Sequence, residues 1–151
     1  MYTDFVPDGK CYYCGEEYAQ YMKPLFENDY AVAYMAGYQK YYPGRCIVVL
    51  KNHKEEICDM TPDEISGFFA LVSKVAYAIQ KAFPCDKLNY GVCGDGNRHF
   101  HMHIVPKVSG GYTWGKLFEM LPPVEDQILI PEAELDEMIK KIQEAAQDYE
   151  K

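Results

Sequence analysis

Three of the four histidines in this chain, His99, His101 and His103, fall within five residues and alternate with apolar side chains. Such alternation is typical of a half-buried β-strand. Because successive side chains of a strand face opposite sides, the three imidazoles share one face, roughly 7 Å apart. Two other interpretations stay open: a solvated face that happens to be rich in histidine, and a three-histidine metal site. Neighbours on one flat strand converge poorly on a tetrahedral ion, which disfavours the second.

Two of the six cysteines, Cys11 and Cys14, have the Cys-x-x-Cys spacing. Residues 1–10 lack the basic and apolar regions of a signal peptide, and no apolar run reaches the roughly 18 residues of a membrane span. We therefore expect a cytoplasmic protein with reduced cysteines and no membrane partner. In that setting the spacing is typical of a redox pair or of half a tetrahedral zinc site. The other four cysteines are interpreted as small buried hydrophobes.

Length and charge narrow the class of protein further. A chain of 151 residues is long enough for one sizeable core, so we expect a single domain over residues 1–151. Apolar residues make up 48% of the chain, which excludes a disordered protein. Acidic residues outnumber basic ones 23 to 15, and the resulting net charge of -8 argues against nucleic acid as a partner.

The elements that must position the histidines can be predicted from periodicity. Thr61-Pro-Asp-Glu64 is typical of a capped helix start, and apolar residues at helical spacing follow it up to residue 83. A strand hairpin through Gly94–Asn97 is expected to lead into the histidines. We expect further helices over about 17–25 (weakly marked) and 131–149, and strands over 30–35, 46–50, 87–92 and 99–105. This order predicts the α+β class, an antiparallel sheet with a helix on one face.

The segment His99-Phe-His-Met-His-Ile-Val-Pro-Lys107 resembles the signature of the histidine triad (HIT) superfamily, His-x-His-x-His followed by apolar residues. Upstream, Gly44–His53 is similar to the family's apolar strand with its final histidine, and Asn89-x-Gly91 precedes the triad as in the family. The resemblance covers about residues 10–115 and is to the zinc-containing, Hint-like bacterial branch. It implies a HIT-like fold with about five antiparallel strands and a long helix, followed here by a C-terminal extension with a helix.

The resemblance also implies an activity. Members of the superfamily bind nucleotides and hydrolyse or transfer at the α-phosphate of nucleoside phosphoramidates or dinucleoside polyphosphates. By resemblance, His101 is the nucleophile and forms a nucleotidyl-imidazole intermediate that water hydrolyses. His103 donates a hydrogen bond to phosphate oxygens, and His99 orients His101 through its carbonyl. The resemblance further implies a homodimer. A non-catalytic nucleotide- or zinc-binding module of the same fold remains the alternative.

Residues expected to bind the substrate are Asn89, Gly96, Asn97 and Arg45. Backbone N–H groups of the Gly94–Asn97 turn can form an anion-binding nest, although Asn97 fits the role of an ordinary turn residue equally well. The sequence departs from the family pattern here, since many members have glutamine and then serine or threonine where this chain has Asp95 and Gly96. The acidic residue expected to bind the ribose is also missing from the tyrosine-rich stretch 36–43.

The resemblance supplies two further ligands for the cysteine pair. Several HIT branches complete a zinc site with the upstream histidine and the first triad histidine, which match His53 and His99 here. The implied centre is a structural Cys₂His₂ zinc site formed by Cys11, Cys14, His53 and His99. It would also hold His99, and through it His101, in place. The alternatives are a thioredoxin-like redox pair, and two idle cysteines with His53 as a surface residue.

Overall fold

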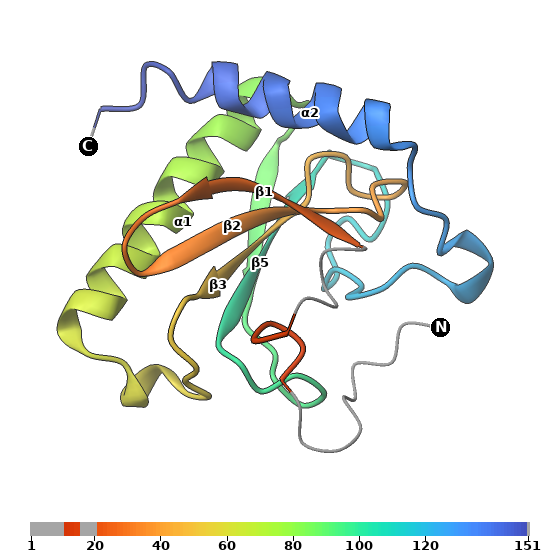
Figure 1. Ribbon diagram of the computed structural model, residues 1–151. Coiled ribbons are helices and arrows are strands. Elements are labelled where there is room, and N and C mark those ends of the chain that lie inside the picture. Colours follow the sequence, from red (N-terminus) through yellow and green to blue (C-terminus); the bar gives the residue numbers. More distant parts are fainter. Residues whose placement is uncertain (1–10, 16–20, 151) are drawn as a thin grey trace.

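The computed structural model describes residues 11–15 and 21–150. Within these residues the chain forms five strands and two long helices: β1 (Met22–Glu27), β2 (Ala31–Ala36), β3 (Cys46–Leu50), α1 (Pro62–Ala82), β4 (Lys87–Gly91), β5 (His101–Lys107) and α2 (Glu132–Ala145). The strands form one antiparallel sheet, α1 covers one face of it, and α2 packs against α1 (Figure 1). The predicted α+β class is therefore confirmed.

The histidine strand β5 lies inside the sheet, whose order is β1-β2-β3-β5-β4. In the antiparallel register His103 lies opposite Ile47 of β3 on one side and opposite Gly91 of β4 on the other. The predicted pairing of the strand over 87–92 with the histidine strand is confirmed, although residues 92–100 form a longer connection than a tight hairpin turn. A strand paired on both sides holds its side chains in fixed directions.

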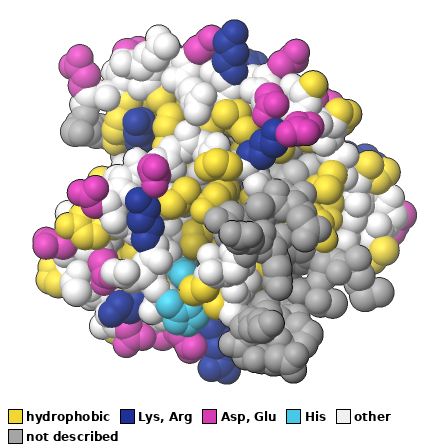
Figure 2. All heavy atoms as spheres, viewed as in Figure 1, with side chains coloured by type: hydrophobic (Ala, Val, Ile, Leu, Met, Phe, Trp, Pro, Cys, Tyr) yellow, Lys and Arg dark blue, Asp and Glu magenta, His cyan; other side chains and the backbone are white. Residues whose placement is uncertain are grey.

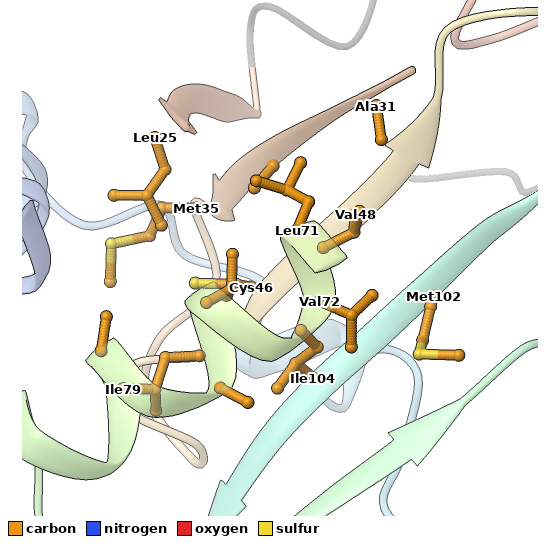
Figure 3. Packing of buried hydrophobic residues seen from close by; sticks show 14 of the residues in the cluster. Leu25, Ala31, Met35, Cys46, Val48, Leu71, Val72, Ile79, Met102 and Ile104 are labelled. Atoms are coloured by element: carbon orange, nitrogen blue, oxygen red, sulfur yellow. The ribbon is translucent and has the colours of Figure 1, made fainter. Parts of the chain in front are cut away.

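The two faces of β5 belong to two different apolar clusters. Phe100, Met102 and Ile104 join the main core between the sheet and α1, much of which Figure 3 shows. The second cluster lies on the opposite face of the sheet, beside the histidines, and contains Tyr12, Met22, Tyr34, Ala36, Ile47 and Val49. The alternation predicted from the sequence is therefore confirmed. The interpretation as a solvated face is wrong, because the three histidines are only 2%, 5% and 6% exposed.

Helix α1 begins with the predicted capping box. The Thr61 side chain accepts from the backbone N–H of Glu64, and the Glu64 carboxylate accepts from the backbone N–H of Thr61. These two bonds satisfy donors that a helix start otherwise leaves unpaired. The helix then buries one apolar stripe, including Phe68, Val75 and Ile79, against the sheet. The main core thus fixes the orientation of β5 from its apolar face.

The weakly marked helix over 17–25 is wrong for the residues that the structure describes there; residues 17–20 lie outside them. Residues 22–27 form β1, which pairs with β2. Met22 and Leu25 are both buried, and in the strand they lie on opposite faces, one in each cluster. A register shift between Pro24 and Phe26 also interrupts the alternation that would have marked a strand.

The C-terminal part of the chain packs against α1 and the main core. Helix α2 ends at Ala145, four residues before the predicted end, and buries Leu135 and Ile142 in the main core. Beyond it, the Tyr149 hydroxyl donates to Ser73 of α1. In the described part of the chain, neither helix has the length and apolar character required to cross a membrane.

Candidate functional site

A cavity of about 250 Å³ opens on the histidine face of the sheet. Its polar lining includes His101, His103, Arg45 and the loop after β4. Its other lining residues are mainly aromatic and apolar: Tyr12, Tyr13, Tyr21, Met22, Ala36, Gly37, Tyr38, Ile47, Met120 and Leu121. The cavity therefore combines imidazoles and other polar groups with aromatic side chains.

Hydrogen bonding assigns the protons of His101. Its Nδ1 lies 2.7 Å from the backbone carbonyl of His99. Because a carbonyl oxygen can only accept, Nδ1 carries the proton and the neutral ring keeps a lone pair on Nε2. His101 lines the cavity, and its ring centroid lies 5.1 Å from that of His103. This tautomer is the one that a nucleophilic imidazole requires.

His103 carries its proton on the other ring nitrogen, Nε2. The guanidinium of Arg45 donates from Nη2 to His103 Nδ1 over 3.1 Å, and because a guanidinium can only donate, the proton of the neutral ring is on Nε2. That Nε2 is buried and has no hydrogen-bond partner among the described residues, although the side chain lines the cavity. Burial, followed by the charges of Arg45 and His101, lowers the pKa of His103 well below 6.5. A neutral donor is thus available for an acceptor in the cavity.

The loop after β4 adds further hydrogen-bond donors to the lining of the cavity. Gly94, Asp95, Gly96 and Asn97 all line the cavity, and Asn97 Nδ2 is a second buried donor without a partner in the described part of the chain. Two buried donors without partners favour an anionic or strongly accepting ligand group. Asp95 is the carboxylate among the residues that line the cavity, and its charge opposes an anion placed beside it.

Arg45 and Asn89 have positions that the sequence did not predict. Arg45 is 4% exposed, and besides His103 it binds the carbonyl of Glu119 through Nη1 over 3.0 Å. It also lines the cavity, and its bond to Nδ1 makes it a support for His103. Asn89 lies in β4 opposite Val105 and is not among the residues that line the cavity.

Several residues that line the cavity were not expected from the sequence. Tyr12 and Tyr13 lie between the two cysteines, so a cysteine pair joined to His99 would have placed them beside the triad. Met120 and Leu121 had no such signal, because they follow an irregular segment that reaches the cavity only in the folded chain. Phe118 of the same segment lies against His103, with 6.2 Å between ring centroids. The segment after β5 therefore forms part of the site.

Four possible metal ligands lie together next to the cavity. They are Cys11, Cys14, His53 and His99, and their ligand atoms all lie within 4.8 Å of one another. The Sγ of Cys11 lies 3.2 Å from His99 Nδ1, and the Sγ of Cys14 lies 3.4 Å from His53 Nδ1 and 3.5 Å from His99 Nδ1. Zinc bond lengths give sulfur–nitrogen separations of about 3.5 Å in a tetrahedral site. These four side chains can therefore hold one tetrahedral ion. Histidine side chains, in cyan, are visible at the surface in the view of Figure 2.

The protonation of His99 suits a metal ligand. Its Nε2 lies 2.6 Å from the carbonyl of Leu50 and must donate to it, so the lone pair of the neutral ring is on Nδ1, toward the two sulfurs. Burial, with smaller contributions from His53 and His101, lowers the pKa of His99 and favours that neutral form. Burial and the neighbouring Cys11 raise the pKa of Cys14. A bound cation would reverse this effect and hold both cysteines as thiolates.

Comparison with known proteins yields a family match and a distant curated relative. A family model described as the HIT domain matches residues 19–110, more than half of the chain. The asymmetrical bis(5'-nucleosyl)-tetraphosphatase of Schizosaccharomyces pombe is 29% identical over 76 residues, which cover 47% of this chain and 42% of that protein. The chain thus matches less than half the length of this relative.

Solved structures share the fold. A histidine triad (HIT) protein from Sinorhizobium meliloti has a TM-score of 0.75 at 20% identity, covering 87% of this chain and 94% of that one. A zinc-bound histidine triad family protein from Mycobacterium smegmatis has a TM-score of 0.57 at 16% identity, covering 82% of each chain. At such identities the likeness shows the fold alone.

The lowered pKa of His103 predicts a pH-dependent contribution to stability. Between the folded-state pKa and about 6.5 the unfolded chain binds a proton that the folded chain does not. The contribution is therefore complete above pH 6.5 and decreases as the pH falls, by up to about 1.4 kcal/mol per pH unit. Urea unfolding between pH 5 and 8 should show a shallower decrease for His103→Gln than for the wild type. Both proteins are measured in one zinc-containing buffer, and parallel curves would contradict the prediction.

Proposed function

Because the chain belongs to the HIT domain family, we propose that it cleaves nucleotidyl conjugates at the α-phosphate, with His101 as the nucleophile. The observation that carries the proposal is the pairing of two complementary imidazoles in one cavity. His101 has a lone pair on Nε2, and His103 has a buried Nε2–H without a partner among the described residues. A phosphate group is both an electrophile for the first and an acceptor for the second.

The proposed reaction has two steps. His101 Nε2 forms a bond to phosphorus while the bond from phosphorus to the leaving group breaks. The leaving group keeps that electron pair and takes up a proton from solvent. The bond from His101 Nδ1–H to the His99 carbonyl stabilises the positive charge that develops on the ring. His103 Nε2–H donates to a phosphate oxygen as negative charge develops there. In the second step water attacks phosphorus while the bond from phosphorus to Nε2 breaks and its electron pair returns to Nε2. A proton of that water passes to solvent, and the nucleoside monophosphate and neutral His101 are released.

The lining of the cavity supports a particular orientation of the ligand. The phosphate lies beside His101 and His103, near the backbone of Gly94–Asn97 and the Asn97 amide, and a flat base packs against tyrosine side chains of the same cavity. Asp95 disfavours additional phosphate groups beside the first one. It favours a leaving group that is neutral or cationic, so within this proposal phosphoramidates of amines are preferred over dinucleoside polyphosphates.

Replacement of the nucleophile tests the proposal. His101→Ala should lower the turnover of adenosine phosphoramidate by at least about 1000-fold, because the covalent step is lost. Release of AMP is followed by liquid chromatography, and mass spectrometry of the quenched wild type should detect an adenylyl group on His101. Cys58→Ser serves as the matched control and should retain full activity. The thiol of Cys58 lies outside the site and is exposed, so its interpretation as a buried hydrophobe is wrong.

The competing function gives a different result. Full activity of His101→Ala would contradict the assignment of the nucleophile. A wild type that binds AMP, but turns over neither phosphoramidates nor dinucleoside polyphosphates, would instead favour the non-catalytic binding module.

We further propose that the four-residue cluster holds a structural zinc ion. Two thiols and two imidazoles are the donor set that tetrahedral zinc prefers, and the zinc-bound relative from Mycobacterium smegmatis shares the fold. In this chain the ion would tie residues 11–15 to His53, after β3, and to His99, before β5. It would also hold the His99 backbone whose carbonyl orients His101.

Elemental analysis tests the metal proposal. The purified protein should contain one zinc per chain, and Cys11→Ser should lose it because a tetrahedral site with three ligands binds more weakly. Zinc at a thousandfold excess over its dissociation constant should raise the free energy of unfolding by about 4 kcal/mol. Cys85→Ser, a change at a half-buried thiol outside the cluster, should retain the zinc. A metal-free wild type with an oxidised Cys11–Cys14 pair would favour the redox interpretation.

We also propose that the chain forms a homodimer through β4 and the adjoining surface of α1. Strand β4 lies at the edge of the sheet, so its outer backbone groups can pair with another strand. An apolar groove beside it is lined by residues of α1, β4 and β5, including Phe69, Ala76 and Tyr90. Tyr90 is 48% exposed, and burial of such a groove favours association.

Light scattering after size-exclusion chromatography tests the dimer. The wild type should have twice the 17.4 kDa of one chain, whereas Tyr90→Glu should be largely monomeric because it buries a charge at the interface. Leu117→Glu, at an 88% exposed position on the segment after β5, serves as a control and should remain dimeric. A monomeric wild type at micromolar concentration would contradict this proposal and leave the catalytic proposal intact.

A further inference from the structure

The two residues between the cysteines contact the catalytic side of the sheet. Tyr12 is 9% exposed and belongs to the second apolar cluster. The ring of Tyr13 lies 5.0 Å from the ring of His101 and 5.8 Å from that of His99. Both tyrosines line the cavity. Residues 11–14 thus supply two of the four possible metal ligands and two of the side chains that line the cavity.

The turn that presents the cysteines also sets the position of the tyrosines. The backbone N–H of Gly15 donates to the carbonyl of Cys11 over 3.2 Å, which closes the turn. When the thiols of Cys11 and Cys14 bind one ion, the backbone between them is restrained at both ends. Figure 1 shows residues 11–15 in red beside the start of β5, at the end of the sheet where the cluster lies. Such an ion would therefore restrain the Tyr13 ring against His101.

Ordering a segment costs free energy, and that cost can be shared between two ligands. In the absence of an ion, a molecule that packs against Tyr13 must itself hold the segment in place, which reduces its affinity. In the presence of the ion the wall is already formed, so the same molecule binds more tightly. Coupling of this kind is reciprocal: the molecule must strengthen ion binding by the same factor.

We propose that metal and nucleotide bind cooperatively, with Tyr13 as the positioning residue that links the two sites. The inference rests on the proposed nucleotide and zinc binding and adds a dependence between them. A second physical connection exists, from His99 through its carbonyl to His101. The two connections are separable, because the aromatic ring of Tyr13 can be removed without changing any ligand of the ion or the hydrogen bond between His99 and His101.

Calorimetry with AMP as the probe measures the coupling. The zinc-loaded wild type should bind AMP about tenfold more tightly than the protein stripped by a chelator, in line with the energy of one well-placed aromatic contact. In the reverse experiment, competition with a chromophoric chelator gives the zinc affinity with and without saturating AMP. AMP should raise that affinity by the same factor. This second experiment starts from the loaded protein, so it does not require a separately prepared stripped sample.

Three variants assign the coupling to the Tyr13 ring. Tyr13→Ala should bind one zinc yet lose the tenfold difference between the loaded and stripped states, whereas Tyr13→Phe should keep it. Tyr38 also lines the cavity, but from the connection between β2 and β3. Tyr38→Ala is the matched control: it should weaken AMP binding by the same factor with and without zinc.

The possible outcomes separate this inference from the function on which it rests. Equal AMP affinities of the loaded and stripped wild type, with no effect of AMP on zinc affinity, would overturn the coupling and leave nucleotide binding standing. A coupling that persists in Tyr13→Ala would assign it to the His99–His101 connection and overturn the role of Tyr13. Failure of the loaded wild type to bind AMP would contradict the proposed function, and the coupling with it.

Discussion

The site depends on three hydrogen bonds to histidine, in each of which the partner can only accept or only donate. The carbonyl of Leu50 accepts from His99, the carbonyl of His99 accepts from His101, and the guanidinium of Arg45 donates to His103. Each bond fixes which ring nitrogen holds the proton. Three identical side chains therefore present a lone pair to the sulfur atoms of Cys11 and Cys14, a lone pair to the cavity and a proton to the cavity.

These hydrogen bonds require a rigid framework, which the sheet and α1 provide. Strand β5 is paired on both sides, and its apolar residues are buried against α1 in the main core. Rotation or slippage of β5 by one residue would expose that apolar face and bury the imidazoles against the helix. The hydrophobic core thus fixes the direction of the histidines on the opposite face. There, the side chains of Cys11, Cys14 and His53 lie around that of His99.

Much of this arrangement was predictable because it depends on local periodicity. The alternation in 99–105 predicts the two faces of β5, and the capping box at Thr61 predicts the start of α1, since both follow from neighbours in the chain. The helix expected over 17–25 is wrong in its described part, where Met22 and Leu25 are buried on opposite faces of a strand. Pairing with β2 decides between helix and strand there, and pairing is not local.

By itself, the sequence determined the triad strand, the class of fold and, through a family resemblance, the four side chains that the structure gathers into one cluster. The tertiary structure decided what each group does in its surroundings. It showed that Arg45, which lines the cavity, also donates the hydrogen bond that fixes the proton of His103, and it brought Met120 and Leu121 to the cavity. The physical reason is that periodicity reports which face a side chain occupies, whereas hydrogen-bond partners and cavity walls come from segments distant in the chain.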